Sequence, residues 1–146
     1  MTPISKRFPL STGITLAGDY YEPLTPAGQP GNDGSPPAPL VLFLHGGGQT
    51  RHAWGGAAAR LAEAGFPTLT VDHRGHGDSS WAEDGDYLFP RFADDLDALL
   101  PLLGQKPVIV GASLGGLSAM AVEARHSEAV SSGIVLVDVT PRLERD

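Results

Sequence analysis

Four short apolar segments alternate with helical patterns along the chain, and this alternation limits the possible folds more than any other feature of the sequence. The segments are residues 40–44, 66–72, 107–112 and 133–139. Between them, apolar side chains recur every three or four residues, which predicts helices near residues 54–62, 89–101 and 114–126. Short apolar strands separated by amphipathic helices predict an α/β fold, a doubly wound and mostly parallel sheet with helices on both faces.

The residues before the first apolar segment predict a different pattern. Residues 6–10 and 14–22 are weaker strand candidates, joined by a turn at residues 11–13. Residues 23–39 hold six prolines and three glycines, which predicts an exposed loop. Neither a repeat nor a second domain is indicated, so we expect residues 1–146 to form a single domain.

The composition excludes several classes of function. The net charge is −7 with only ten lysine and arginine residues, so the chain lacks the basic surface that nucleic-acid binding requires. It has no cysteine, which excludes disulfides and thiolate chemistry. No apolar segment reaches the ~18 residues of a membrane-spanning helix, and the first residues lack the apolar core of a signal peptide. We therefore expect a cytoplasmic protein that binds neither membranes nor nucleic acid.

The clearest chemical motif lies between the third apolar segment and the helix that follows it. Residues 111–115 read Gly-Ala-Ser-Leu-Gly and fit the G-x-S-x-G pattern of a nucleophile elbow. A turn this sharp strains the backbone of Ser113, lifts its hydroxyl off the carboxyl edge of the sheet and sets it above the N–H groups of a helix start. We therefore predict Ser113 as a nucleophile; the alternative is a glycine-rich helix entry with a capping serine.

A second motif, His-Gly-Gly-Gly, begins at His45 directly after the first apolar segment. Glycines at this place let backbone N–H groups approach a substrate oxygen without an intervening side chain. We predict an oxyanion hole from the N–H groups of Leu114 and Gly47, with Gly46 or Gly48 as the less favoured donor. The alternative is a tight turn that needs a positive φ. We interpret His45 itself as a brace for the loop and not as a base.

In this order and spacing, LVLFLHGGG, TVDHRGHGDS, VIVGASLGG and GIVLVDVTP resemble the amino-terminal half of the α/β-hydrolase superfamily, in particular its small esterase, lipase and peroxidase-like members. The resemblance covers nearly the whole chain except residues 23–39. It implies a serine hydrolase that cleaves small carboxylic esters through an acyl-enzyme at Ser113, with no cofactor. Perhydrolase or peroxidase, thioesterase and carbon–carbon bond hydrolase activities stay open, whereas a serine nucleophile disfavours dehalogenase or epoxide-hydrolase chemistry.

The resemblance also implies groups that this chain does not supply. The family order is serine, acid, histidine, and the histidine follows later strands, so we expect a chain truncated after the sixth strand, without the lid and the last strands. Of the five histidines, four precede Ser113, and His126 lies ~20 Å away at the far end of the next helix. Asp138, after the sixth strand, occupies the position of the acid in some relatives; the alternative is an ordinary aspartate that holds a loop.

A second hypothesis follows from the missing histidine. The chain would then be a catalytically incomplete fragment, or half of a split protein, that needs another segment to supply the base. Its exposed sheet edge would bind a second copy or a complementary chain.

Three further groups of polar residues have simpler interpretations. The turn at residues 72–79 resembles the family's turn after the fourth strand, whose arginine and aspartates hold loops in place. His73 and His76 are spaced like metal ligands but lack a third ligand, so no metal site is predicted. The aspartates at positions 94, 95 and 97 are predicted to form the solvated face of a helix.

Overall fold

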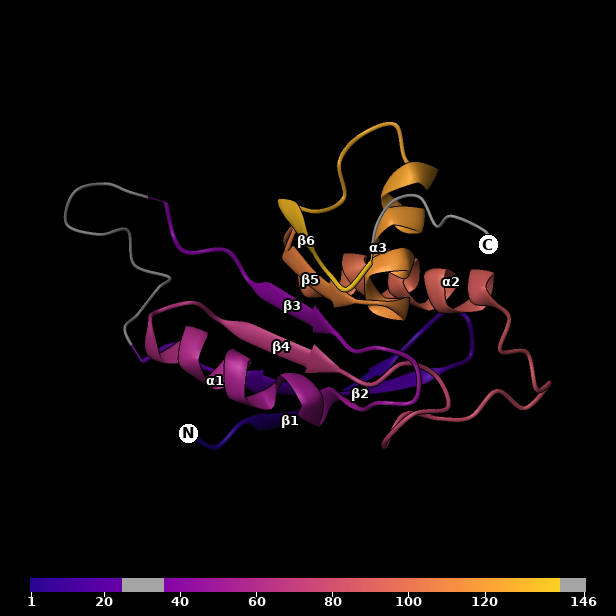
Figure 1. The fold of residues 1–146 in the computed structure, drawn as a ribbon, viewed down its shortest axis with the longest axis horizontal. Helices are drawn as coiled ribbons and strands as arrows, with labels where there is room; N and C mark the ends of the chain where they lie inside the picture. The colour runs from indigo at the N-terminus through magenta and orange to yellow at the C-terminus, as the bar shows by residue number, and fades with distance from the viewer. Residues whose placement is uncertain (25–35, 140–146) are drawn as a thin grey trace.

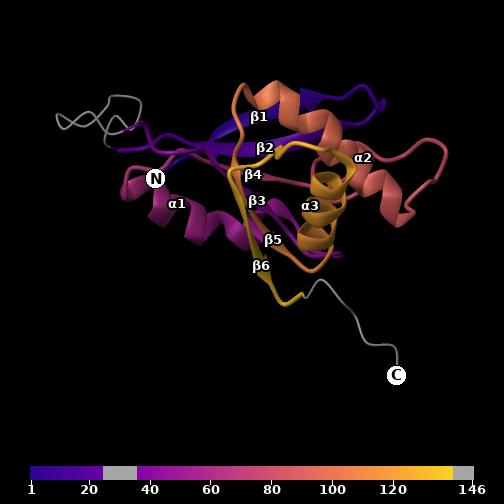
Figure 2. The ribbon, with the colours of Figure 1, turned by 90° about the horizontal axis from the view of Figure 1, so that it is seen from above.

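The computed structural model describes residues 1–24 and 36–139, so most of the predicted loop at 23–39 lies outside the described residues. Six strands form one sheet: β1 (Ile4–Pro9), β2 (Thr15–Tyr21), β3 (Val41–Leu44), β4 (Thr68–Val71), β5 (Val108–Ala112) and β6 (Gly133–Val137). Their order is β1-β2-β4-β3-β5-β6, as Figure 2 shows. Strands β4, β3, β5 and β6 run parallel, and β1 and β2 add an antiparallel hairpin at one edge. The predicted α/β fold is confirmed.

Helices cover both faces of this sheet (Figure 1). On one face lies α1 (Gly55–Glu63), preceded by the 3-10 turn η1 (Arg51–Trp54). On the other face lie α2 (Phe89–Leu99), continued by the 3-10 turn η2 (Leu100–Leu103), and α3 (Leu114–Arg125). Among the described residues, no helix combines the length and the apolar character needed to cross a membrane.

The central strand β3 shows why the apolar segments are continuous rather than alternating. Val41 and Phe43 pack against the α1 face, whereas Leu42 and Leu44 belong to the core beneath α2 and α3. All four side chains are buried. A strand covered on both faces excludes polar side chains from both, which accounts for the uninterrupted apolar run.

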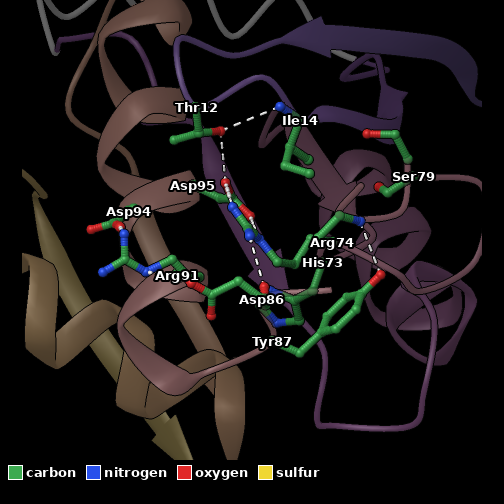
Figure 3. Close-up of polar contacts among 12 residues, drawn as sticks. Thr12, Ile14, His73, Arg74, Ser79, Asp86, Tyr87, Arg91, Asp94 and Asp95 are labelled. Carbon is green, nitrogen blue, oxygen red and sulfur yellow. Dashed lines mark hydrogen bonds and ion pairs between the residues drawn. The ribbon is translucent and has the colours of Figure 1, made fainter. Parts of the chain in front are cut away.

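A buried ion pair fastens α2 to the turn after β4 (Figure 3). Arg74 donates from Nε and Nη2 to the two carboxylate oxygens of Asp95, at 2.6 and 2.7 Å. The hydroxyl of Thr12, in the β1–β2 turn, donates to the same carboxylate at 2.8 Å. This pair therefore joins three segments that are distant in sequence.

The prediction of a solvated acidic face on α2 is wrong for Asp95, which is only 3% exposed. Helical spacing explains this burial, since Asp95 follows the buried Phe92 by three residues and precedes the buried Leu99 by four. Asp94 and Asp97 stay partly exposed and pair with the surface arginines Arg91 and Arg125. The three aspartates therefore have different roles.

We expect Asp95→Ala to lower the free energy of unfolding by about 3 kcal/mol or more, because it leaves the buried Arg74 charge without its carboxylate partner. The matched substitution Asp94→Ala removes a surface carboxylate from the same helix and should cost no more than about 1 kcal/mol. Urea unfolding of both variants measures the difference. Equal losses in the two variants would contradict the anchoring role of Asp95.

Candidate active site

Ser113 joins β5 to α3 in a backbone conformation that few residues other than glycine adopt, with φ 46° and ψ −110°. Its N–H donates to the carbonyl of Val137 in β6 at 3.1 Å, and its carbonyl accepts the N–H of Leu117 at 2.9 Å. The residue is exposed, and its side chain makes no capping bond to α3. The alternative of a capping serine is therefore not supported, and the hydroxyl stands at the carboxyl edge of the sheet.

Both glycines of the G-x-S-x-G pattern are required by close backbone contacts. A Cβ added at Gly111 would lie 2.5 Å from the backbone nitrogen of Gly116. One added at Gly115 would lie 2.5 Å from the carbonyl oxygen of Leu44, at the end of β3. Any larger side chain would push α3 away from the sheet, so these two positions fix the turn that presents Ser113.

The glycine loop, residues 46–48, lies directly beside this turn. A Cβ added at Gly46 would be 3.7 Å from the Cβ of Ser113, and one added at Gly47 would be 3.9 Å from Cδ2 of Leu114. Leu114 is the first residue of α3, so its N–H has no acceptor within the helix. The fold thus brings together the three residues predicted for the nucleophile and the oxyanion hole.

The three N–H groups of the glycine loop are not equivalent. That of Gly46 donates to Oε1 of Gln49 at 3.1 Å, and that of Gly48 donates to Nε2 of His76 at 3.0 Å. Among the described residues, the N–H of Gly47 has no acceptor. Gly47 therefore differs from its two neighbours in having an N–H that no described residue accepts.

His45 and His73 form a buried brace beneath the loop. His45 donates from Nδ1 to the carbonyl of Gly46 at 2.7 Å and accepts the N–H of His73 on Nε2 at 3.0 Å. In return, Nε2 of His73 donates to the carbonyl of His45 at 2.9 Å. Burial lowers the pKa of His45 below its ordinary 6.5 and lowers the pKa of His73 to about 3. Both rings are neutral, and the bracing role predicted for His45 is confirmed.

The other three histidines make different contacts. His76 accepts a hydrogen bond from the glycine loop, His52 is exposed on η1, and His126, at the end of α3, contacts Asp97 at 2.8 Å. Within residues 1–24 and 36–139, no histidine ring bonds to the Ser113 hydroxyl. In the same residues no cluster of three histidine or acidic side chains is suited to a metal ion.

Asp138 follows β6 with φ 52°, a left-handed conformation that aspartate tolerates better than most residues. Its neighbours on both sides contact the turn around Ser113: Val137 accepts the Ser113 N–H, and Val139 lies against Gly116. The Asp138 residue is exposed, and its carboxylate makes no hydrogen bond among the described residues. It lies beside the turn, and its role as an acid stays a prediction.

Two residues of this region had no signal in the sequence. The side-chain oxygen of Gln49 accepts the N–H of Gly46. Arg51 is buried and binds Asp72 and Asp78 through Nη1, at 2.5 and 2.8 Å, with Asp19 3.0 Å from its Nε. These contacts tie the segment after the glycine loop to the turn after β4, which confirms the structural interpretation of residues 72–79. Neither residue belongs to a periodic pattern, so only the tertiary structure identifies them.

We expect Gly115→Ala to lower the free energy of unfolding by about 1–3 kcal/mol, because the new methyl group would overlap the backbone of Leu44. Gly56→Ala is a matched control in α1, where an added Cβ meets nothing within 4 Å. Alanine is the better helix former, so this control should be neutral or more stable by up to about 1 kcal/mol. Chemical unfolding compares the two variants, and a neutral Gly115→Ala would refute the close contact.

The low pKa of His73 predicts a loss of stability in acid. Between about pH 6.5 and 3 the unfolded chain binds a proton that the folded chain does not. The stability that neutral His73 contributes is complete above the ordinary pKa and falls with decreasing pH, by up to about 1.4 kcal/mol per pH unit. His73→Gln should flatten this dependence, whereas the exposed His52→Gln should not. Parallel unfolding profiles for wild type and His73→Gln would contradict the assignment.

Comparisons with known proteins agree with this geometry. The family model for the alpha/beta hydrolase fold matches residues 39–144. The chain is 45% identical to Esterase Rv0045c of Mycobacterium tuberculosis, over 71% of this chain and 34% of that protein. It is 39% identical to the sn-1-specific diacylglycerol lipase ABHD11 of Mus musculus, over 75% of this chain and 35% of that protein.

A solved structure of an alpha/beta hydrolase from Novosphingobium aromaticivorans is 31% identical, with a TM-score of 0.78 over 97% of this chain and 46% of that one. The chain spans about a third of the length of the two curated relatives. The matched residues hold the glycine loop, Ser113 and all four parallel strands. On this evidence the chain belongs to the alpha/beta hydrolase fold family.

Proposed function

We propose that the chain forms the nucleophile and oxyanion-hole half of a serine hydrolase that acts on carboxylic esters. In this proposal Ser113 is the nucleophile, and the N–H groups of Gly47 and Leu114 bind the oxyanion. Asp138 is the acid. The histidine base comes from a polypeptide segment outside residues 1–146. The names of the two curated relatives, an esterase and a lipase, support the ester class of substrate.

One observation carries the proposal: two N–H groups, neither with an acceptor among residues 1–24 and 36–139, adjoin an exposed serine in a strained turn. Gly47 is exposed and Leu114 is partly exposed, so both N–H groups are accessible and can bind a substrate oxygen in place of water. They come from different strand ends, Gly47 after β3 and Leu114 after β5. Their convergence beside Ser113 suits a tetrahedral oxyanion formed on a carbonyl that the serine attacks.

The proposed reaction proceeds through an acyl-enzyme. The Ser113 oxygen adds to the ester carbonyl while the base removes its proton, and the two N–H groups stabilise the oxyanion by about 3 kcal/mol for each donor. The tetrahedral intermediate then expels the alcohol, which takes the proton from the base. Water then adds to the acyl-enzyme while the base removes its proton. The Ser113 oxygen leaves, takes that proton back from the base, and the carboxylic acid is released.

A second candidate is a non-catalytic half of a split protein, favoured by the sheet edge at β6. Among the described residues β6 pairs only with β5, and Val135 on it is 50% exposed. An unpaired strand edge binds other strands readily. In this case the partner would be a second copy of the chain or a complementary chain.

Intact-mass spectrometry before and after treatment with a fluorophosphonate probe tests the proposal. On the protein that also carries the base, we expect one adduct, because the activated serine attacks phosphorus as it would a carbonyl. Ser113→Ala should remove the adduct, whereas the exposed Ser11→Ala, a matched serine in the β1–β2 turn, should retain it. Asp138→Asn should slow labelling by up to about 10⁴-fold if that carboxylate orients the base.

Labelling that persists in Ser113→Ala would overturn the proposal. A chain of residues 1–146 that stays unlabelled and elutes as a self-associated species from size-exclusion chromatography would favour the second candidate. A sharp monomer peak with a cooperative thermal transition would exclude association through the β6 edge.

A further inference from the structure

The tip of the glycine loop, Gly47 and Gly48, has almost no side-chain packing to hold it. Gly48 has φ +78°, and a Cβ added there would meet nothing within 4 Å. At Gly47 the nearest atom to an added Cβ is Cδ2 of Leu114, at 3.9 Å. Because side-chain contacts do not fix this segment, its conformation depends on the hydrogen bonds made by its own backbone groups.

One of those bonds ties the loop to a distant part of the chain. The Gly46 N–H bonds to Gln49, three residues away, and so holds the loop only to itself. The Gly48 N–H instead donates to Nε2 of His76, which is 28 residues away in the turn after β4. His76 therefore ties the tip of the loop to the turn after β4, whereas the His45–His73 brace ties the base of the loop to the same turn.

The His76 ring is itself held in one orientation. Its Nδ1 donates to the carbonyl of Arg74 at 2.9 Å, and its ring lies 5.1 Å from that of His45 and 6.2 Å from that of Phe92, measured between centroids. Arg74 is in turn fixed by Asp95 on α2. The two bonds of the ring require a proton on Nδ1 and a lone pair on Nε2, the neutral tautomer that can accept from the loop.

We propose that His76 is a positioning residue for the oxyanion hole. By accepting the Gly48 N–H it turns that peptide toward the protein and leaves the Gly47 N–H as the outward donor beside Leu114. His76 contacts neither Ser113 nor the substrate and acts through the loop alone. The inference rests on the proposed function, in which Ser113 attacks an ester.

Two substitutions separate this role from simple stabilisation of the turn. His76→Gln places its amide oxygen where Nε2 stood and can still accept the Gly48 N–H. His76→Asn places its amide where Nδ1 stood and can still donate to the carbonyl of Arg74, but cannot reach the loop. His126→Gln is the matched control at the far end of α3.

With p-nitrophenyl acetate, on the protein that carries the base, His76→Asn should lower kcat by about 10- to 100-fold and leave KM within about twofold. His76→Gln should restore kcat to within about threefold of wild type, and His126→Gln should not change it. A role confined to the turn predicts the opposite order, with Asn better than Gln. That order, or a wild-type kcat in His76→Asn, would overturn the inference.

Amide hydrogen exchange supplies a readout that does not depend on activity. In the wild type and in His76→Gln the Gly48 amide should exchange slowly and the Gly47 amide rapidly, and His76→Asn should remove the Gly48 protection. A rapidly exchanging Gly48 amide in the wild type would also overturn the inference. If Ser113→Ala retains esterase activity, the proposed function fails and His76 positions no oxyanion hole. If activity requires Ser113 but not His76, only the present inference fails.

Discussion

The close approach of α3 to the sheet is the contact on which the rest of the site depends. At Gly111 and Gly115 backbone meets backbone, with no room for a Cβ on either side. This contact forces the chain to turn within a single residue, so Ser113 takes a positive φ and its hydroxyl leaves the sheet edge. It also brings the first N–H of α3 to the end of β3, where the glycine loop begins. A strained serine and a free donor therefore have one common cause.

Neutral histidines hold the glycine loop against the turn after β4, and only the neutral form of the ring can make these hydrogen bonds. His45 accepts a backbone N–H on one ring nitrogen, and His76 does the same for the glycine loop. A protonated ring has two donors and no acceptor, so it could not make these bonds. Three of the five histidines thus serve as hydrogen-bonding spacers between loops. Their abundance near Ser113 does not indicate a general base, and the proposed base must reach the serine from elsewhere.

The fold and the sharp turn at Ser113 could be predicted from the sequence because local signals determine them. Continuous apolar runs mark strands buried on both faces, and the spacing of Gly111 and Gly115 around Ser113 marks the sharp turn. The burial of Asp95 could not be predicted, because its partner Arg74 is 21 residues away and only the packing of α2 brings them together. The contacts of Gln49 and His76 with the glycine loop could not be predicted for a similar reason: each side chain binds a backbone N–H, and a backbone partner leaves no trace in residue type.

The strand order has a consequence for how such a site can change its selectivity. The chain leaves β3 toward α1 on one face and leaves β5 toward α3 on the other, so the two connections diverge from adjacent strand ends. Ligands of open α/β sheets bind at such a reversal. Here the groups that would hold a reacting carbonyl belong to the backbone at that point, whereas the side chains that would select the two ends of a substrate belong to the diverging segments. Substitutions in those segments can change what is bound without altering how the carbonyl is held.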